Sequence, residues 1–217
     1  MSDQAPSCQR DAAASPDTRA PAGRCPRLIV IFLSVTVLIL GVDLASKYLA
    51  FHHVADQPVR LGEPGATATM YSHEPVTVVP GVLSLKLTVN EGAVFGLGQG
   101  NRLFFIAVSI VAAIVLLSIF YRSSARAYIL HLALALVLAG ALGNLYDRAV
   151  YGMVRDMFWI FPGATLPFGL TWPGGDHRLY PWVFNVADVA LVVGVLTLVA
   201  ITWFGELRQQ GEQKADD

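Results

Sequence analysis

The chain has 217 residues, of which 54% are hydrophobic and only 14% are charged, whereas about a quarter of the residues in a soluble domain carry a charge. This composition indicates an integral membrane protein. With 15 basic and 16 acidic residues, the chain also lacks the basic surface that nucleic-acid binding requires.

The first 27 residues are rich in Ala, Ser, Pro and charged side chains and have no apolar periodicity, which predicts a disordered tail. An apolar run then continues from residue 28 to about residue 51, long enough to cross a bilayer. No small-residue cleavage site follows it, so we interpret it as an uncleaved span rather than as a signal peptide. Asp43 and Lys47 lie four positions apart on one face of this helix, which suits an ion pair. We favour a purely structural pairing for Lys47 and expect Asp43 to shape a site.

A β-hairpin is predicted after this span. Residues 52–75 form a polar loop, and residues 76–79 and 83–90 are typical of two short strands around a Pro-Gly turn. The second strand alternates apolar and polar residues, so one of its faces is apolar. That face can lie on the bilayer surface or against the spans.

Three further apolar runs predict spans at about residues 103–121, 128–146 and 184–204. Ala139 and Gly143, four positions apart in the third span, would let another helix approach closely. The predicted fold class is therefore an α-helical membrane protein with four transmembrane helices and a small extracytoplasmic β-element.

An even number of spans places both termini on one side of the membrane. Arginines in the N-terminal tail and in the connector 122–126, and basic residues in the C-terminal tail 207–217, indicate that this side is cytoplasmic. The hairpin, Asn90, Asp156 and Asp188 are then expected to meet at the outer face.

The end of the third span carries a dense group of polar side chains. A charged side chain near the middle of a bilayer costs on the order of 3 kcal/mol, so such residues usually face a protein interior, find partners and carry function. The group lies in GALGNLYDRAVYGMVRD at residues 140–156 and comprises Asn144, Asp147, Arg148, Arg155 and Asp156.

A second acidic residue begins the last span. Asp188 lies in the first turn of that helix, three residues after Asn185, where the helix N-terminus favours a negative charge and Asn185 can cap the helix. If Asp156 comes within a few ångströms of Asp188, the two carboxyl groups will share one proton. Such a pair can hydrolyse a peptide, because one carboxylate takes a proton from water while the other carboxyl group polarises the scissile carbonyl. We hypothesise that Asp156 and Asp188 form this catalytic pair.

Two alternatives remain open on the residues alone. Asp147 could be the catalytic acid, or it could neutralise Arg148 and position the following loop. Asp156 and Asp188 could also merely satisfy arginines such as Arg148 and Arg155.

Other hydrolytic chemistries fit the sequence less well. The five histidines have no metal-ligand spacing and no H-E-x-x-H motif occurs, so we expect neither a metal nor another cofactor. No G-x-S-x-G motif is present, and Ser46 and Lys47 are adjacent in a helix, so their side chains point apart.

Four motifs in order resemble those of lipoprotein signal peptidases (signal peptidase II), the aspartyl peptidases of the bacterial inner membrane. They are VDLASK at 42–47, NEGAVFG at 90–96, GALGNLYDR at 140–148 with GMVRD at 152–156, and FNVADVAL at 184–191. The resemblance covers about residues 28–206, which we expect to form the peptidase domain between two cytoplasmic tails.

The resemblance implies a multi-pass inner-membrane enzyme that cuts diacylglyceryl-modified prolipoproteins just before the lipidated cysteine. We also expect a monomer. It implies that Asp156 and Asp188 are the catalytic dyad, and it moves Asp147 to a supporting role. The other residues that it places around the site are Asp43, Lys47, Asn90, Gly92, Asn144, Arg148, Asn185 and Ala187.

The chain departs from the family pattern in its long segments 52–75 and 157–183, which put access to the site in question. The alternative from another functional class is a small non-enzymatic membrane protein, such as a transporter subunit or an assembly factor. A transporter would show internal repeats and interrupted helices, which we do not find in the sequence.

Overall fold

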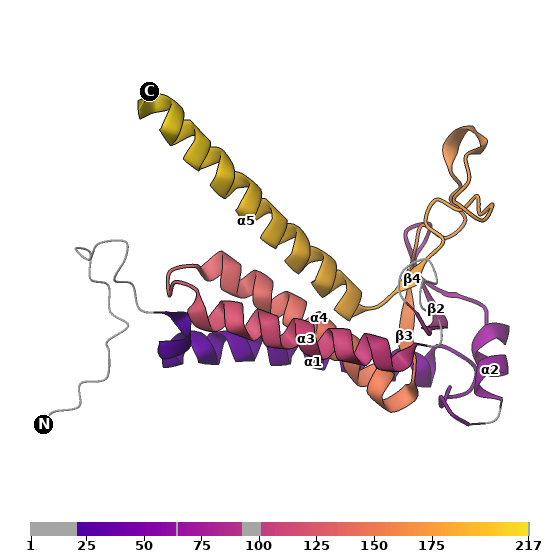
Figure 1. The fold of residues 1–217 in the computed structure, drawn as a ribbon. Coiled ribbons are helices and arrows are strands. Elements are labelled where there is room, and N and C mark those ends of the chain that lie inside the picture. The colour runs from indigo at the N-terminus through magenta and orange to yellow at the C-terminus, as the bar shows by residue number, and fades with distance from the viewer. Residues whose placement is uncertain (1–20, 64, 93–100, 217) are drawn as a thin grey trace, which may run out of the picture.

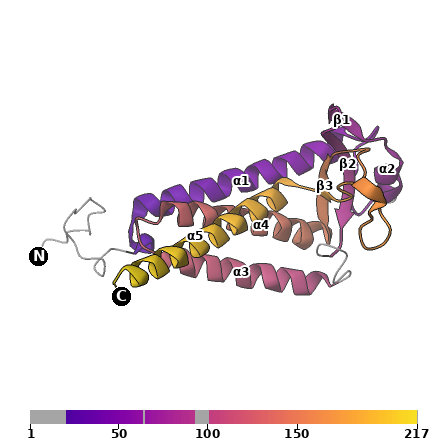
Figure 2. The ribbon, with the colours of Figure 1, turned by 90° about the horizontal axis from the view of Figure 1, so that it is seen from above.

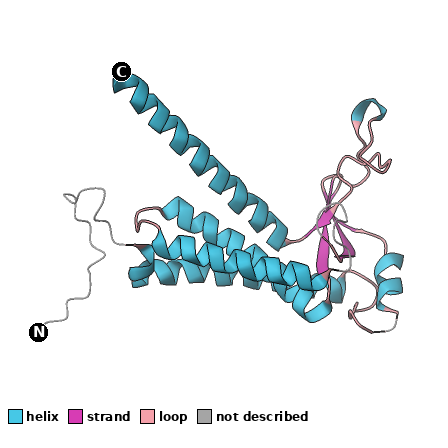
Figure 3. Ribbon diagram, in the orientation of Figure 1, coloured by secondary structure: helices cyan, strands magenta, loops and turns pink. Residues whose placement is uncertain are grey.

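The computed structural model describes residues 21–63, 65–92 and 101–216. The predicted tail at 1–20 and the motif residues 93–96 therefore lie outside the described part of the chain. Helices dominate, and the strands gather at one end of them (Figure 3).

Four helices are long and apolar enough to cross a membrane. They are α1 (Pro26–His53), α3 (Arg102–Arg122), α4 (Tyr128–Tyr151) and α5 (Val186–Asp216). In Figures 1 and 2, α1, α3 and α4 run side by side, whereas α5 starts beside α4 near the sheet and diverges from the other helices in Figure 1. The predicted fold class is confirmed, and α5 continues well beyond residue 204, where we expected the last span to end.

The sheet has four antiparallel strands in the order β1-β2-β3-β4. They are β1 (Val76–Val79), β2 (Leu83–Asn90), β3 (Val154–Ile160) and β4 (Val183–Phe184). β1 and β2 confirm the predicted hairpin. β3 and β4 were not predicted, because we interpreted the sequence after Asp156 as a loop. In the β2–β3 register, Thr88 lies opposite Asp156 and Asn90 opposite Val154.

Three short helices also lie where we predicted no regular structure. They are η2 (Ala22–Arg24), α2 (Ala66–Ser72) and η4 (Pro167–Gly169). η2 corrects the predicted tail, since Ala22 is buried and its backbone N–H donates to the Ser123 carbonyl. α2 corrects the predicted polar loop, since Met70 is buried in an apolar cluster.

That apolar cluster holds the sheet against the end of α1. Phe51 of α1, Met70 of α2, Leu87 of β2 and Met157 of β3 are buried together in it. The apolar face of β2 therefore packs against the end of a span and α2, which decides between the two surfaces that we considered for it.

Small residues bring α5 close to α4. A Cβ atom on Gly140 would lie 2.4 Å from the Ala187 carbonyl oxygen, and one on Gly194 would lie 2.9 Å from the Ala133 carbonyl oxygen. A side chain at either position would clash, so the two helices can lie this close only because these residues are glycine, as in closely packed membrane helices. The predicted close approach at Gly143 is confirmed, since a Cβ there would lie 2.4 Å from Asp43 Oδ2 of α1 and 3.2 Å from the Ala187 Cβ of α5. Gly140, which we did not single out, makes the closer approach to α5.

Candidate active site

A buried ion-pair network joins α1 to α4. The Lys47 Nζ lies 2.8 Å from Asp43 Oδ2 and 3.2 Å from Asp147 Oδ2, and it also donates to Asn144 Oδ1 at 3.2 Å. The Asp43, Lys47 and Asp147 side chains are fully or almost fully buried. The expected Asp43–Lys47 pair is present, but Lys47 also neutralises Asp147, 100 residues further along the chain.

Asp147 binds Arg155 as well. The Arg155 guanidinium donates to Asp147 Oδ1 from Nε at 3.2 Å and from Nη2 at 2.8 Å, and the Arg155 backbone N–H donates to Oδ2 at 3.0 Å. This contact requires the chain to reverse immediately after α4. Gly152 allows the reversal, since it ends α4 with φ 82°, a left-handed conformation that glycine adopts at little cost.

Asn185 connects the two candidate catalytic carboxyl groups. Its Nδ2 donates to Asp156 Oδ1 at 2.6 Å, and its backbone N–H donates to Asp188 Oδ2 at 3.1 Å. It is fully buried and also contacts Asn144 Oδ1 at 3.2 Å. One side chain thus holds Asp156 of β3 beside Asp188 of α5.

Asp188 is held at the N-terminus of α5 by three hydrogen bonds. Its backbone N–H donates to Asn185 Oδ1 at 2.9 Å, and its carboxylate accepts from the Asn185 backbone N–H. This reciprocal arrangement is a helix cap of the kind expected from the Asn-x-x-Asp spacing. Asn144 Nδ2 donates the third bond to Asp188 Oδ1, at 2.8 Å.

Asp156 lies in a much drier environment than Asp188. Its side chain is on β3 and the residue is 3% exposed. Burial, and next the negative charge of Asp188, raise the pKa of the Asp156 carboxyl well above its ordinary value. The protonated form of Asp156 is therefore favoured beside a second carboxylate.

Arg148 lies between the site and the turn that follows β2. Its Nη2 donates to the Gly92 carbonyl at 3.0 Å, and its guanidinium stacks over the Phe105 ring, 4.9 Å from the centroid. Asn90 Oδ1 accepts the Gly92 backbone N–H at 2.9 Å. The Arg148 Nε is buried and has no partner in the described part of the chain.

Ala187 and Gly143 complete the packing around Asp43. The Ala187 backbone N–H donates to Asp43 Oδ1 at 2.8 Å. A Cβ atom on Gly143 would lie 2.4 Å from Asp43 Oδ2 and 3.2 Å from the Ala187 Cβ. The structure thus brings all eleven predicted site residues to the sheet end of the helices, with Gly92 joined to Arg148 and Asn90 joined to Gly92 by hydrogen bonds.

The sequence left open whether Asp147 neutralises Arg148, and whether Asp156 and Asp188 merely satisfy arginines. Asp147 has both carboxylate oxygens engaged by Lys47 and Arg155, and no salt bridge joins it to Arg148 among the described residues. Likewise, within the described ranges no salt bridge joins Asp156 or Asp188 to an arginine.

Two residues that contact the site received no role there in the sequence analysis. Arg155 was named but given no role, although a charged residue beside an apolar span is a usable signal. Gly143 was named only for helix packing, whereas it packs against Asp43.

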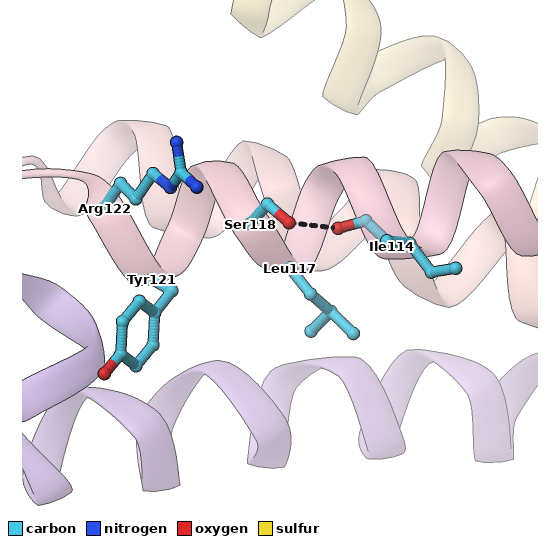
Figure 4. A pocket seen from close by; sticks show the side chains of 5 residues that line it. All are labelled: Ile114, Leu117, Ser118, Tyr121 and Arg122. Atoms are coloured by element: carbon cyan, nitrogen blue, oxygen red, sulfur yellow. Dashed lines mark hydrogen bonds between the residues drawn. The ribbon is translucent and has the colours of Figure 1, made fainter.

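A separate cavity of about 390 Å³ lies along the second half of α3 (Figure 4). It is lined by Ile114, Leu117, Ser118, Tyr121 and Arg122. The Ser118 hydroxyl donates to the Ile114 carbonyl of its own helix, so it is already engaged. Elsewhere in the described ranges, no three His, Cys, Asp or Glu side chains form a group that could hold a metal ion.

Comparison with known proteins identifies the family of the chain. The family model of signal peptidase (SPase) II matches residues 35–204. The lipoprotein signal peptidase of Enterococcus faecalis is 30% identical over 79% of this chain and 87% of its own length. That of Actinobacillus succinogenes is 31% identical over 86% of this chain and 94% of its own length.

Two solved structures of bacterial membrane enzymes share the fold. One, at 2.3 Å resolution, matches with a TM-score of 0.60 at 24% identity over 81% of this chain and 88% of that chain. The other, at 1.9 Å resolution, has a TM-score of 0.58 at 25% identity over 80% and 93%. With a family model that covers most of its length, the chain belongs to the signal peptidase II family of membrane peptidases.

Proposed function

We propose that this chain is an aspartic endopeptidase that removes the signal peptide from diacylglyceryl-modified prolipoproteins, cutting just before the lipidated cysteine. The observation that carries the proposal is the position of Asn185, which bonds Asp156 through its side chain and Asp188 through its backbone. Family membership supports the peptidase activity, and the relatives' name, lipoprotein signal peptidase, supports the class of substrate.

The surroundings of the two carboxyl groups suit different roles. Asp188 accepts a hydrogen bond at each carboxylate oxygen at a helix N-terminus. Asp156 is buried with a raised pKa. We therefore assign Asp188 as the general base and Asp156 as the general acid.

In this mechanism Asp188 takes a proton from water while the water oxygen bonds to the scissile carbonyl carbon. Asp156 gives its proton to the carbonyl oxygen, which yields a neutral gem-diol. The C–N bond then breaks as Asp188 returns its proton to the leaving nitrogen and Asp156 takes back a hydroxyl proton. Both groups end in their starting states, so the cycle needs only water.

Other charged groups hold this pair in place. The Lys47, Asp147 and Arg155 network fixes the end of α4 and the start of β3, and Asp43 fixes the first turn of α5 through Ala187. Arg148 has an unpartnered buried donor, which we assign to a backbone carbonyl of the substrate.

The proposed orientation places the sheet end of the helices at the outer face of the inner membrane. The start of α1 and the C-terminal end of α5 lie at the opposite end in Figure 1, in accord with cytoplasmic termini at 1–27 and 207–217 around a peptidase domain of 28–206. A lipidated substrate in the outer leaflet could then present its lipid to the helices and its peptide to the sheet. We propose that the enzyme acts as a monomer.

The test is cleavage of a purified diacylglyceryl-modified prolipoprotein by wild type, Asp156→Asn and Asp188→Asn, with the product mass giving the cleavage position. We expect wild type to cut before the lipidated cysteine and both variants to lose at least about 10³-fold in kcat, since each removes a proton-transfer group. Circular dichroism and thermal unfolding check that the variants fold.

Near-normal cleavage by a folded variant would show that the dyad assignment is wrong. Failure of folded wild type to cut would favour the non-enzymatic alternative.

A further inference from the structure

The segment between β3 and β4 has a hairpin structure of its own. Thr165 and Arg178 form an antiparallel bridge, and the Leu179 backbone N–H donates to the Ala164 carbonyl at 2.8 Å. Figure 1 shows this orange segment projecting from the sheet near the start of α5. Because backbone hydrogen bonds close the hairpin, they fix where the residue that follows it lies relative to the sheet.

That residue is Tyr180. Its carbonyl accepts the Trp159 indole N–H at 3.1 Å, which ties it to β3. Its ring packs edge-on against Phe184, with centroids 6.0 Å apart at 90°, and against Trp182 at 5.3 Å. Phe184 directly precedes Asn185, so the Tyr180 ring packs on the residue next in sequence to the one that connects the two carboxyl groups.

The hydroxyl of Tyr180 lies within the electrostatic field of both carboxyl groups. Burial, and then the charges of Asp188 and Asp156, raise the pKa of Tyr180 above its ordinary value. The phenol therefore stays protonated and remains a hydrogen-bond donor over the working pH range.

The carboxyl groups do not need Tyr180 to hold them. Asp188 already accepts bonds at both oxygens, and Asp156 accepts one from Asn185. In the part of the chain that the structure describes, the Tyr180 hydroxyl makes no hydrogen bond, and the residue is partly exposed. Its donor is therefore available to a molecule that enters the site.

We infer that Tyr180 contacts the substrate, donating a hydrogen bond from its hydroxyl to a backbone carbonyl of the peptide bound beside Asp156 and Asp188. This inference rests on the proposed function. It also gives the long segment 157–183 a role, because the hairpin within that segment positions the donor.

The experiment compares kcat/KM of wild type, Tyr180→Phe and Tyr128→Phe on the purified diacylglyceryl-modified prolipoprotein. Tyr180→Phe keeps the ring against Phe184 and removes only the hydroxyl. Tyr128→Phe is the matched control, since Tyr128 is exposed at the far end of α4. We expect Tyr180→Phe to lower kcat/KM about 10-fold, the usual effect of one lost hydrogen bond of roughly 1.4 kcal/mol, with an unchanged thermal midpoint and a normal Tyr128→Phe.

Activity of Tyr180→Phe within about twofold of an active wild type would overturn the inference and leave the proposed function intact. An equal loss in Tyr128→Phe would also overturn it, because the effect would not be specific to the site. A folded wild type that does not cut would overturn the proposed function and this inference with it.

Discussion

Two Asp–Arg pairs in this chain have the same chemistry and opposite surroundings. Arg155 and Asp147 meet at 2.8 Å with side chains 7% and 0% exposed, whereas Arg178 and Asp176 meet in the 161–182 segment with side chains 43% and 29% exposed. Water can solvate either member of the second pair if the other is removed. The first pair is almost completely buried, so each member depends on its partner. The comparison shows that burial, rather than the pairing itself, makes an ion pair structurally important.

The largest expected effect is on stability, from Asp147→Asn. This change leaves the buried Arg155 guanidinium without a counter-charge, and Lys47 with Asp43 alone. Breaking a buried pair in this way costs about 3–5 kcal/mol. The measurement is the thermal midpoint and the free energy of unfolding in detergent micelles.

The control for this prediction is the double variant Asp147→Asn with Arg155→Gln. It removes both charges of the pair, so we expect it to recover part of the lost stability. If the free energy of unfolding of Asp147→Asn lies within about 1 kcal/mol of the wild-type value, burial does not make this ion pair important.

The second-largest expected effect is a loss of stability and of cleavage rate in Gly143→Ala, which lies at the site. The new Cβ would lie 2.4 Å from Asp43 Oδ2, so Asp43 must move away from the Ala187 N–H at the start of α5. We expect about 1–3 kcal/mol of destabilisation from overpacking and a fall in cleavage rate of about 10-fold or more. Gly41→Ala in α1 is the matched control, since its Cβ would meet nothing within 4 Å; equal behaviour of the two variants would refute the prediction.

We expect a smaller effect of pH on stability and on cleavage, which arises because Asp156 loses its proton as pH rises. Its folded-state pKa lies above the value of 3.8 for an ordinary Asp, so the folded protein holds this proton more tightly than the unfolded chain does. The Asp156 contribution to stability is therefore greatest at low pH and declines as pH rises from about 3.8 through the raised pKa, by at most about 1.4 kcal/mol per pH unit. Cleavage should decline as Asp156 loses its proton in the upper part of this range.

Thermal midpoints of wild type and Asp156→Asn, measured across the pH range, check this prediction. Asn carries no titrating proton, so the variant should gain stability relative to wild type as pH rises. A constant difference between the two proteins at every pH would count against it.

The smallest effect is expected from Asp176→Asn in the exposed pair. Hydrogen bonds from Arg178 lower the pKa of Asp176 to about 2, so its contribution is present above about pH 4 and is lost as pH falls towards 2. At neutral pH we expect a change in thermal midpoint within about 1 °C and cleavage within about twofold of wild type. A large loss of cleavage would instead indicate that Arg178 helps to position Tyr180.

Local patterns predicted the elements whose sequence signal is regular. The spans follow from uninterrupted apolar runs, the β1–β2 hairpin follows from the Pro-Gly turn and the alternation in its second strand, and the Asp43–Lys47 pair follows from helical spacing. β3 gave no such signal. Residues 154–157 are all buried, including Arg155 and Asp156, so the strand lacks the alternation of a half-buried strand.

The sequence by itself determined that this is a four-helix membrane protein with acidic residues at the ends of two spans, because length, apolar content and motif order are local properties. Only the tertiary structure decided which charges meet. Lys47 pairs with Asp147, Asp147 pairs with Arg155, and Asn185 connects Asp156 to Asp188. These partners lie on different helices and strands, and the close approach at Gly140 and Gly143 brings those elements together. Such distances depend on how whole elements pack, which no local spacing encodes.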